Sequence, residues 1–379
     1  MKNILITGGA GFIGSNLAIK LLTRGYNVTI LDNLSEQIHG KDPKTTSPLY
    51  NNIKNSGAAF VKGSVTDRKT LEQVIEHQDC IVHLAAETGT GQSMYEIERY
   101  CQTNIMGTAL LADVLTNKKH NVEKVVVASS RAIYGEGKYF CKHCGDVYPS
   151  AREDKAMHEG DFECKCPVCS SDVELVATDE NSLIHPTSVY GINKQNQEQM
   201  IMLLGNTLGI SSTALRYQNV YGPTQSLSNP YTGILSVFST QIRNEHPLNI
   251  FEDGNESRDF VFIDDVTDAT ILAIEKKQST GEIFNIGTGI STSVNDVAKE
   301  LIANYGINVP MKISGNYRLG DIRHNFADIS KADKLLDYKP KISFAEGIKR
   351  FTSWVKTQDV TEDKYQSSID EMKSKGLYK

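Results

Sequence analysis

Short apolar runs alternate with longer amphipathic segments through the first 220 or so residues of the chain. The apolar runs are rich in Val and Ile and cover residues 2–8, 27–32, 58–63, 79–85, 124–130 and 212–222. The amphipathic segments between them cover residues 14–25, 67–78, 104–118 and 186–209. Buried strands that alternate with helices are typical of a parallel sheet covered on both faces. The pattern therefore predicts an α/β fold with a doubly wound parallel sheet.

The alternation loosens after about residue 222. Loops, short strands and helices follow one another there, which predicts a second, smaller C-terminal lobe over residues 222–360 with some segments returning to the first domain. The last residues, 361–379, are polar, so we expect a loosely packed tail. The predicted organisation is thus a main domain over residues 1–221, a smaller lobe and a tail.

Composition and charge narrow the class of protein. The chain has 379 residues, 39% of them hydrophobic, and a formal net charge of -6. A mildly acidic chain lacks the basic field that nucleic-acid binding requires, which argues against such a partner. No apolar run is long enough for a membrane span, and the N-terminus enters a strand without the features of a signal peptide. We expect a cytoplasmic enzyme with no membrane partner.

The first chemical motif is ITGGAGFIGSN, which stands between the first predicted strand and the first predicted helix. Gly8, Gly11 and Gly14 would let the turn close tightly and let the backbone approach a pyrophosphate at the helix N-terminus. A glycine triplet alone is weak, but the strand, the helix and Asp32 at the end of the next strand agree with it. A carboxylate there can accept both ribose hydroxyls and would repel a 2'-phosphate. The motif predicts a Rossmann domain that binds NAD rather than NADP.

The second group of residues consists of Ser130 at a strand end and the pair Tyr190 and Lys194 in YGINK. Four-residue spacing places the phenol and the ammonium on one face of a helix, where the positive charge favours the phenolate. A YxxxK pattern by itself is usually a solvated helix face. Combined with the glycine loop and the serine, it predicts a catalytic group.

Five of the seven cysteines lie between Ser130 and Tyr190. Four of these five form two CxxC pairs. The first, CKHC, contains Cys141 and Cys144, the second, CPVC, contains Cys166 and Cys169, and 21 residues separate the two pairs. This spacing predicts a zinc ribbon inserted over residues 138–178, with four thiolates around a structural zinc. Cys164 is a fifth candidate that could replace a ligand, and loose thiols are the alternative to a metal site. Cys80 and Cys101 fall on a strand and a helix, so we expect them to be core residues.

Ten ordered motifs carry a resemblance to a known family. TGGAGFIG, HLAAETGTGQSM, TNIMGT, SSRAIYG, YGINK, LRYQNVYGP, RDFVFIDDV, FNIGTG and RLGDIRHNFADISKA, together with DN at 32–33, cover residues 1–355 or so in order. The chain resembles the extended short-chain dehydrogenase/reductase family, in its nucleotide-sugar epimerase/dehydratase branch. Within that branch it is similar to sugar-nucleotide 4-epimerases, among them the dTDP-L-rhamnose 4-epimerases.

The resemblance implies NAD as cofactor, a nucleotide sugar as substrate and a homodimer formed through the helices at 103–115 and around Tyr190. By position it implies cofactor contacts from Phe12, Ile13, Asp32, Asn33, Ser64, Val65, Leu84, Ala85, Ala86, Asn104, Tyr190, Lys194 and Tyr217. It implies substrate contacts from Thr88, Arg131, Asn219, Arg258, Arg318, Asp321 and Arg323. The arginines fit a diphosphate, because the guanidinium fork matches its oxygens. Ser64 departs from the family, which commonly has Asp there; Asp67 could partly substitute.

The residues after Ser130 bear on the type of reaction. The 4,6-dehydratases of the branch have an Asp-Glu pair there, whereas this chain has Arg131 and Ala132, which argues against dehydration. Transient oxidation remains, with Tyr190 as the base, and the net result is epimerisation, which we expect at C4 of a dTDP- or UDP-sugar. A dehydratase or a 2-epimerase of the same family is the alternative. A non-enzymatic alternative is an NAD-binding scaffold with a zinc ribbon that binds other proteins.

Overall fold

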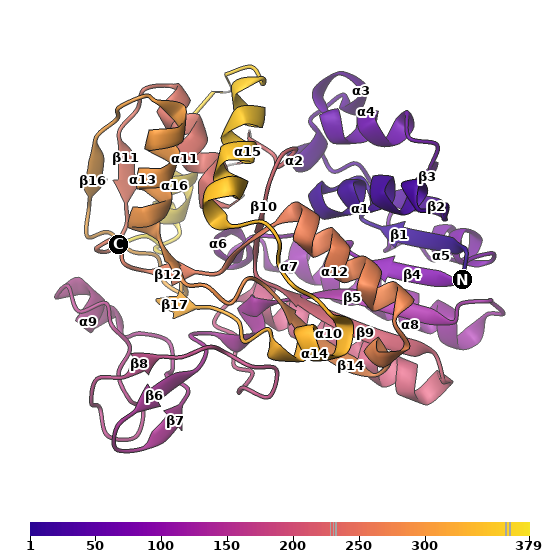
Figure 1. The fold of residues 1–379 in the computed structure, drawn as a ribbon, viewed down its shortest axis with the longest axis horizontal. Helices are drawn as coiled ribbons and strands as arrows, with labels where there is room; N and C mark the ends of the chain where they lie inside the picture. Colours follow the sequence, from indigo (N-terminus) through magenta and orange to yellow (C-terminus); the bar gives the residue numbers. More distant parts are fainter. Residues whose placement is uncertain (228, 230, 232, 361, 364) are drawn as a thin grey trace.

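A seven-stranded parallel sheet forms the middle of the larger domain (Figure 1). The computed structural model describes residues 1–379 apart from residues 228, 230, 232, 361 and 364. The strand order is β14-β9-β5-β4-β1-β2-β3, and every neighbouring pair is parallel. The strands are β1 (Asn3–Thr7), β2 (Asn27–Asp32), β3 (Ala59–Lys62), β4 (Cys80–His83), β5 (Lys124–Ser130), β9 (Ser211–Tyr217) and β14 (Glu282–Ile286). The predicted Rossmann-type doubly wound sheet is confirmed.

Helices cover both faces of this sheet because its side chains alternate between two apolar layers. Ile4 and Ile6 face α1 (Phe12–Thr23) and α12 (Ile263–Glu275), whereas Leu5 faces the opposite layer. That layer is built by α5 (Arg68–Ile75), α8 (Gly107–Asn117) and α10 (Val189–Leu208). Since α12 and β14 come late in the chain, segments beyond residue 222 do return to the main domain.

The smaller lobe has its own core. Leu235, Phe238, Val297 and Phe351 are among its buried residues. They come from α11 (Ile234–Arg243), α13 (Val294–Tyr305) and α15 (Phe344–Lys356), which surround β11 (Leu248–Ile250) and β16 (Met311–Ile313). Two further small sheets consist of β10 (Asn219–Tyr221) with β13 (Phe260–Phe262), and of β12 (Ser257–Arg258) with β15 (Thr292–Ser293) and β17 (His324–Asn325).

The cysteine-bearing insertion forms a small unit of its own beside the smaller lobe (Figure 1). Its sheet consists of β6 (Tyr139–Cys141), β7 (Gly145–Val147) and β8 (Glu174–Leu175), and α9 (Asp154–His158) connects β7 to β8. Tyr139, Cys141, Val147, Cys164 and Cys166 make up a core of only five buried side chains. Such a core is too small to fold a segment of this length without a further constraint.

The other helices are short. Most lie in the loops of the main domain: α2 (Glu36–His39), α3 (Pro43–Thr46), α4 (Pro48–Lys54), α6 (Thr90–Ser93), α7 (Ile97–Tyr100), the π-helix η1 (Cys101–Met106), the 3₁₀ turns η2 (Arg131–Tyr134) and η3 (Lys277–Ser279), and α14 (Ser330–Leu336). Over the described residues, no helix has the length and apolar character that a membrane crossing would need.

The C-terminal tail differs from the loosely packed segment that the sequence predicts. Residues Tyr365–Ser374 form α16, and Ile369, Met372 and Tyr378 are buried in a cluster with Tyr95 and Phe251. The backbones of Tyr317 and Lys379 exchange two hydrogen bonds, at 3.1 and 3.0 Å. Although the tail is mostly polar, its apolar residues recur at helical spacing. This apolar stripe packs the tail against the smaller lobe.

Candidate active site

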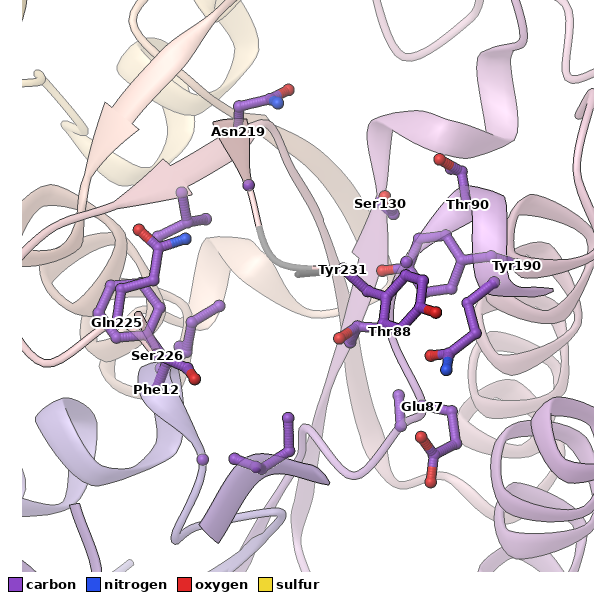
Figure 2. Close-up of a pocket in the computed structure, with 18 of the residues that line it drawn as sticks. Phe12, Glu87, Thr88, Thr90, Ser130, Tyr190, Asn219, Gln225, Ser226 and Tyr231 are labelled. Atoms are coloured by element: carbon purple, nitrogen blue, oxygen red, sulfur yellow. The ribbon is translucent and has the colours of Figure 1, made fainter. Parts of the chain in front are cut away.

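A cavity of about 610 Å³ lies between the carboxyl ends of the sheet strands and the smaller lobe. This is the place where doubly wound sheets bind their ligands. Figure 2 shows Ser130, Thr88 and Tyr190 on one side of the cavity, with Phe12 and Gln225 across from them. The glycine loop, Asp32 and the residues predicted for catalysis all line this one cavity.

The glycine loop is shaped for a pyrophosphate. A side chain at Gly8 would collide with the backbone of Ala85 at 2.8 Å, and Gly8 has a φ of +69°, which favours glycine. At Gly14 a Cβ would lie 2.5 Å from the Gly8 carbonyl oxygen. The residue before α1, Gly11, offers no side-chain cap, so the first N–H groups of that helix face the cavity. These donors fit the diphosphate of NAD.

Asp32 ends β2 at the edge of the cavity and is nearly buried. One of its oxygens accepts a hydrogen bond from the Ala10 N–H at 2.9 Å, and the other accepts one from the Leu34 N–H at 2.8 Å. His39 Nε2 lies 3.9 Å from the carboxylate, and burial lowers the pKa of this histidine, so it is neutral near pH 7. A fixed carboxylate with remaining lone pairs fits the two ribose hydroxyls of an adenosine.

Ser64 lines the cavity, but Asp67 does not stand in for the missing family carboxylate. The Asp67 side chain caps α5, accepting hydrogen bonds from the Lys69 N–H at 3.1 Å and the Thr70 hydroxyl at 2.6 Å. Asp67 is absent from the cavity lining among the described residues. The Ser64 hydroxyl lies 2.7 Å from Thr66 Oγ1.

The predicted catalytic residues come together where β5 ends and α10 begins. Ser188 caps α10, and the Ser93 hydroxyl accepts a hydrogen bond from the Tyr190 N–H at 3.0 Å, which fixes the first turn of the helix. The Ser130 hydroxyl accepts a hydrogen bond from the Ala132 N–H at 3.1 Å and lies near enough to the phenol of Tyr190 to influence its pKa. One turn later, the buried Lys194 ammonium donates to the Ala128 carbonyl at 3.1 Å.

The electrostatics of this group are set by burial. Burial raises the pKa of Tyr190, although the nearby Ser130 hydroxyl and the positive charge of Arg131 act in the opposite direction. Burial also lowers the pKa of Lys194 to about 7. Without further positive charge the phenol therefore keeps its proton at neutral pH. The positive ring of oxidised NAD would add that charge, so that the phenol can act as a base.

Arg131 occupies the position at which dehydratases of the branch have an acid. Its Nε donates to Asn219 Oδ1 at 2.7 Å. Burial and the nearby charge of Arg258 lower the pKa of Arg131 to about 9, so it stays charged at neutral pH. A cation next to Ser130 cannot protonate a leaving hydroxyl as a carboxylic acid would, which argues against elimination of water.

Three more residues predicted for the substrate meet on the smaller-lobe side of the cavity. The Nε and Nη2 atoms of Arg318 both lie 2.7 Å from Asp321 Oδ2. Arg258 donates to three backbone carbonyls, those of Ser257 and Arg323 at 2.8 Å and that of Ile322 at 2.6 Å. Because these carbonyls carry no net charge, the positive charge of Arg258 is left for an anionic ligand.

Two predicted contacts lie outside the cavity lining. Asn104 is fully buried, and its amide exchanges hydrogen bonds with the backbone of Glu87 at 2.7 and 3.1 Å, so it holds the loop after β4 rather than the cofactor. Arg323 is 1% exposed, and its guanidinium is enclosed by Glu163, Glu252 and Asp253. With its donors taken up by these acids, Arg323 is not available to a substrate, and we correct that prediction.

All the other predicted cofactor and substrate residues line the cavity. They are Gly8, Gly11, Phe12, Ile13, Gly14, Asp32, Asn33, Ser64, Val65, Leu84, Ala85, Ala86, Thr88, Ser130, Arg131, Tyr190, Lys194, Tyr217, Asn219, Arg258, Arg318 and Asp321. Sequence reasoning missed other lining residues, among them Gln225, Tyr231, Asn249, Glu256, Tyr365, Ser368 and Met372. Tyr365, Ile369 and Met372 stand at helical spacing, and this signal could have placed α16 against the core.

The four cysteines of the two CxxC pairs gather at one point of the insertion. Their sulfur atoms all lie within 4.8 Å of one another, and the sulfurs of Cys141 and Cys169 are 3.6 Å apart. Four sulfurs at about 2.3 Å from a tetrahedral zinc would be about 3.8 Å apart, whereas a disulfide bond is about 2.05 Å long. Among the described residues this group does not include Cys164, which is buried beside Glu136 and Tyr139. The arrangement suits a four-thiolate metal site.

The chain is similar to known proteins over most of its length. The sequence model of the NAD dependent epimerase/dehydratase family matches residues 4–151 and 168–287. A dTDP-L-rhamnose 4-epimerase of Burkholderia thailandensis is 36% identical over 356 residues, covering 93% of this chain and 95% of the relative. A putative UDP-glucose 4-epimerase of Methanocaldococcus jannaschii is 35% identical over 365 residues, covering 94% and 100%.

Solved structures of the same kind superpose on most of the chain. The UDP-glucose 4-epimerase of Thermotoga maritima, with UDP-glucose, has a TM-score of 0.76 and 32% identity over 93% of this chain and 98% of its own. The UDP-glucuronic acid 4-epimerase of Bacillus cereus, in complex with UDP-glucuronic acid and NAD, has a TM-score of 0.75 and 28% identity over 93% and 99%. The two structures contain a nucleotide sugar, and the second contains NAD as well.

Proposed function

Since the chain belongs to the NAD-dependent epimerase/dehydratase family, we propose that it inverts the configuration at C4 of a nucleotide sugar through a transient 4-keto sugar. The observation that carries this proposal is the meeting of Ser130, Tyr190 and Lys194 beside the glycine loop, with Arg131 in place of the dehydratase acid. Ser130 would hold the sugar hydroxyl, and Tyr190 would take its proton and later return it. Bound NAD would accept a hydride from C4 and return it to the opposite face of the sugar.

The substrate we propose is a dTDP- or UDP-sugar. Relatives named for each class are similar over nearly the same share of this chain, and Arg258 and Arg318 suit the diphosphate that both classes contain. Incubation with dTDP-, UDP-, GDP- and CDP-sugars, followed by NMR of the products, identifies the base and the sugar. We expect turnover with a dTDP- or UDP-sugar, and turnover confined to GDP- or CDP-sugars would contradict this choice.

The cofactor should be NAD rather than NADP. A 2'-phosphate would have to approach Asp32, whose oxygens are fixed by backbone N–H groups and cannot turn away. We expect at least about 100-fold tighter binding of NAD, since leaving a negative charge unpaired beside another costs several kcal/mol at an enclosed site. Calorimetric titration with both cofactors measures this ratio. The variant Asp32→Asn should lower the ratio of NAD affinity to NADP affinity. Equal affinities for NAD and NADP in the unaltered protein would contradict the role of Asp32.

We place a structural zinc at Cys141, Cys144, Cys166 and Cys169. The small core of the insertion and the grouping of four sulfur atoms support it. Four protein ligands would leave no open position for a substrate, so the metal would stabilise the insertion and take no part in the reaction. Reduced cysteines of this kind, together with a nucleotide-sugar substrate, fit the cytoplasmic location that the sequence predicts.

We also propose a homodimer that forms across α8 and α10. Met106, Ile192 and Leu203 are apolar side chains left 46%, 46% and 68% exposed on this side of the main domain. Light scattering at micromolar concentration should give twice the chain mass of 41.9 kDa. The variant Leu203→Glu should shift the protein toward the monomer, and a monomeric unaltered protein would contradict the proposal.

A further inference from the structure

A buried cluster of charged side chains joins the insertion to the main body, beside an apolar contact of Met157 and Phe162 with Tyr317. Arg152, which precedes α9, places both Nη atoms 2.8 Å from the two carboxylate oxygens of Glu252 and its Nε 3.3 Å from Glu136. These three side chains are at most 5% exposed. Glu163, also from the insertion, lies 2.6 Å from Nη2 of Arg323. Buried pairs of this kind are rigid, because breaking one leaves a charge without a partner.

This cluster holds the chain segment that positions Arg258 and Arg318, two of the three arginines among the described lining residues of the cavity. Arg152 Nη2 donates to the Asp321 carbonyl at 2.9 Å, and the Asp321 side chain in turn holds Arg318. The Arg323 N–H donates to Glu136 Oε2 at 2.6 Å, and the Arg323 carbonyl accepts from Arg258. Both arginines are thus oriented by a segment, residues 318–323, that is fixed from outside the cavity.

The charges indicate why such an anchor is needed. Arg258 donates to neutral carbonyls only, among the contacts that the described residues make, and burial lowers its pKa because its charge has lost water. A guanidinium in that state binds an anion well only if it does not have to move, since ordering it at the moment of binding would cost affinity.

We propose that Arg152 and Glu163 of the insertion, and Arg323 beneath the cavity, are positioning residues that set the affinity for the diphosphate of the substrate. The insertion then governs substrate binding without touching the substrate. The inference rests on the proposed function, because it takes the anion in this part of the cavity to be the diphosphate of a nucleotide sugar. It gives the insertion a task beyond its own folding.

The test compares ligands that differ by one phosphate. Binding of UDP and dTDP, of UMP and dTMP, and of NAD is measured by calorimetry for the unaltered protein and for Arg152→Met. We expect diphosphate affinity to fall about 10- to 100-fold, as is typical when the partner that orients a binding group is lost. The affinity for UMP and dTMP should fall less. The affinity for NAD should stay within about 2-fold of that of the unaltered protein, since the glycine loop lies in the main domain, whereas Arg258 and Arg318 lie on the smaller-lobe side of the cavity.

Two further variants keep the test decisive. Glu163→Gln removes only the carboxylate that the insertion contributes, from a side chain that is 53% exposed, so it should fold even if Arg152→Met does not. Its diphosphate affinity should fall in the same direction. Lys142→Met removes an exposed ion pair with Glu174 in the same insertion and should leave every affinity unchanged.

Unchanged diphosphate affinity in folded Arg152→Met or Glu163→Gln would overturn the inference and leave the proposed function standing. An equal loss for monophosphates and diphosphates would also overturn it, because a general loosening of the lobe does not distinguish one phosphate from two. If the unaltered protein bound neither UDP nor dTDP, the proposed function would fail and the inference with it.

Discussion

Replacing Tyr190 with Phe should lower the turnover number by about 10²- to 10⁴-fold, the usual contribution of a positioned proton acceptor. Tyr190 and Ser130 both line the cavity, whereas the N–H of Tyr190, held by Ser93, is unaffected by the substitution. The change removes one oxygen and leaves the ring, so the affinity for the nucleotide sugar should change by less than about 3-fold.

Steady-state kinetics and calorimetric titration measure the two effects separately. Tyr26→Phe is the matched control, because its hydroxyl donates to Glu275 on the outside of the molecule at 3.0 Å. It should retain full activity. Activity of Tyr190→Phe close to that of the unaltered protein would exclude Tyr190 as the residue that moves the proton.

The second large effect should follow from the loss of one cysteine of the insertion. The unaltered protein should contain about one zinc per chain with four sulfur ligands at about 2.3 Å, and Cys144→Ser should contain almost none. Because the apolar cluster around the cysteines has only five buried residues among those the structure describes, we expect the insertion to unfold without the metal, while the seven-stranded sheet stays folded and NAD still binds.

Metal analysis, X-ray absorption at the zinc edge and a turnover assay provide the measurements. Turnover at low substrate concentration should fall about 10-fold or more, since unfolding the insertion also removes Arg152 from its partners. Cys101→Ser, which changes a cysteine outside the insertion, is the control and should keep the zinc. Metal-free unaltered protein with full activity would show the cysteines to be incidental, and a water ligand on the zinc would point to a catalytic metal.

Much of the fold could be predicted because most strands and helices of the main domain can be recognised from short, continuous stretches of sequence. Runs such as NILIT and NVTILD are short, rich in Ile, Leu and Val and largely buried, as expected for a sheet covered on both sides, so six of the strands could be read directly. The seventh strand, β14, was recognised only as part of a motif, since it follows the smaller lobe and its neighbour β9 lies about 70 residues earlier in the chain.

The candidate site was predictable where it rests on short motifs and not where it depends on contacts between distant segments. Gly8, Asp32, Tyr190 and Lys194 line one cavity because the ends of parallel strands converge. Arg323 shows the limit of this reasoning. Nothing in RLGDIRHNF tells which of its arginines faces the cavity, and the answer depends on Glu163 and Glu252, which lie far away in sequence.

In the proposed reaction, C4 of the sugar loses a hydride to NAD and then regains the same hydrogen on the opposite face. The most direct test is to incubate the protein with a nucleotide sugar that carries deuterium at C4, in ordinary water, and to examine the product by NMR and mass spectrometry. We predict the C4 epimer with the deuterium retained at C4 and no change in mass, because the hydride never leaves the enclosed site. Exchange of the deuterium for solvent hydrogen, or a product lighter by one water molecule, would contradict the account.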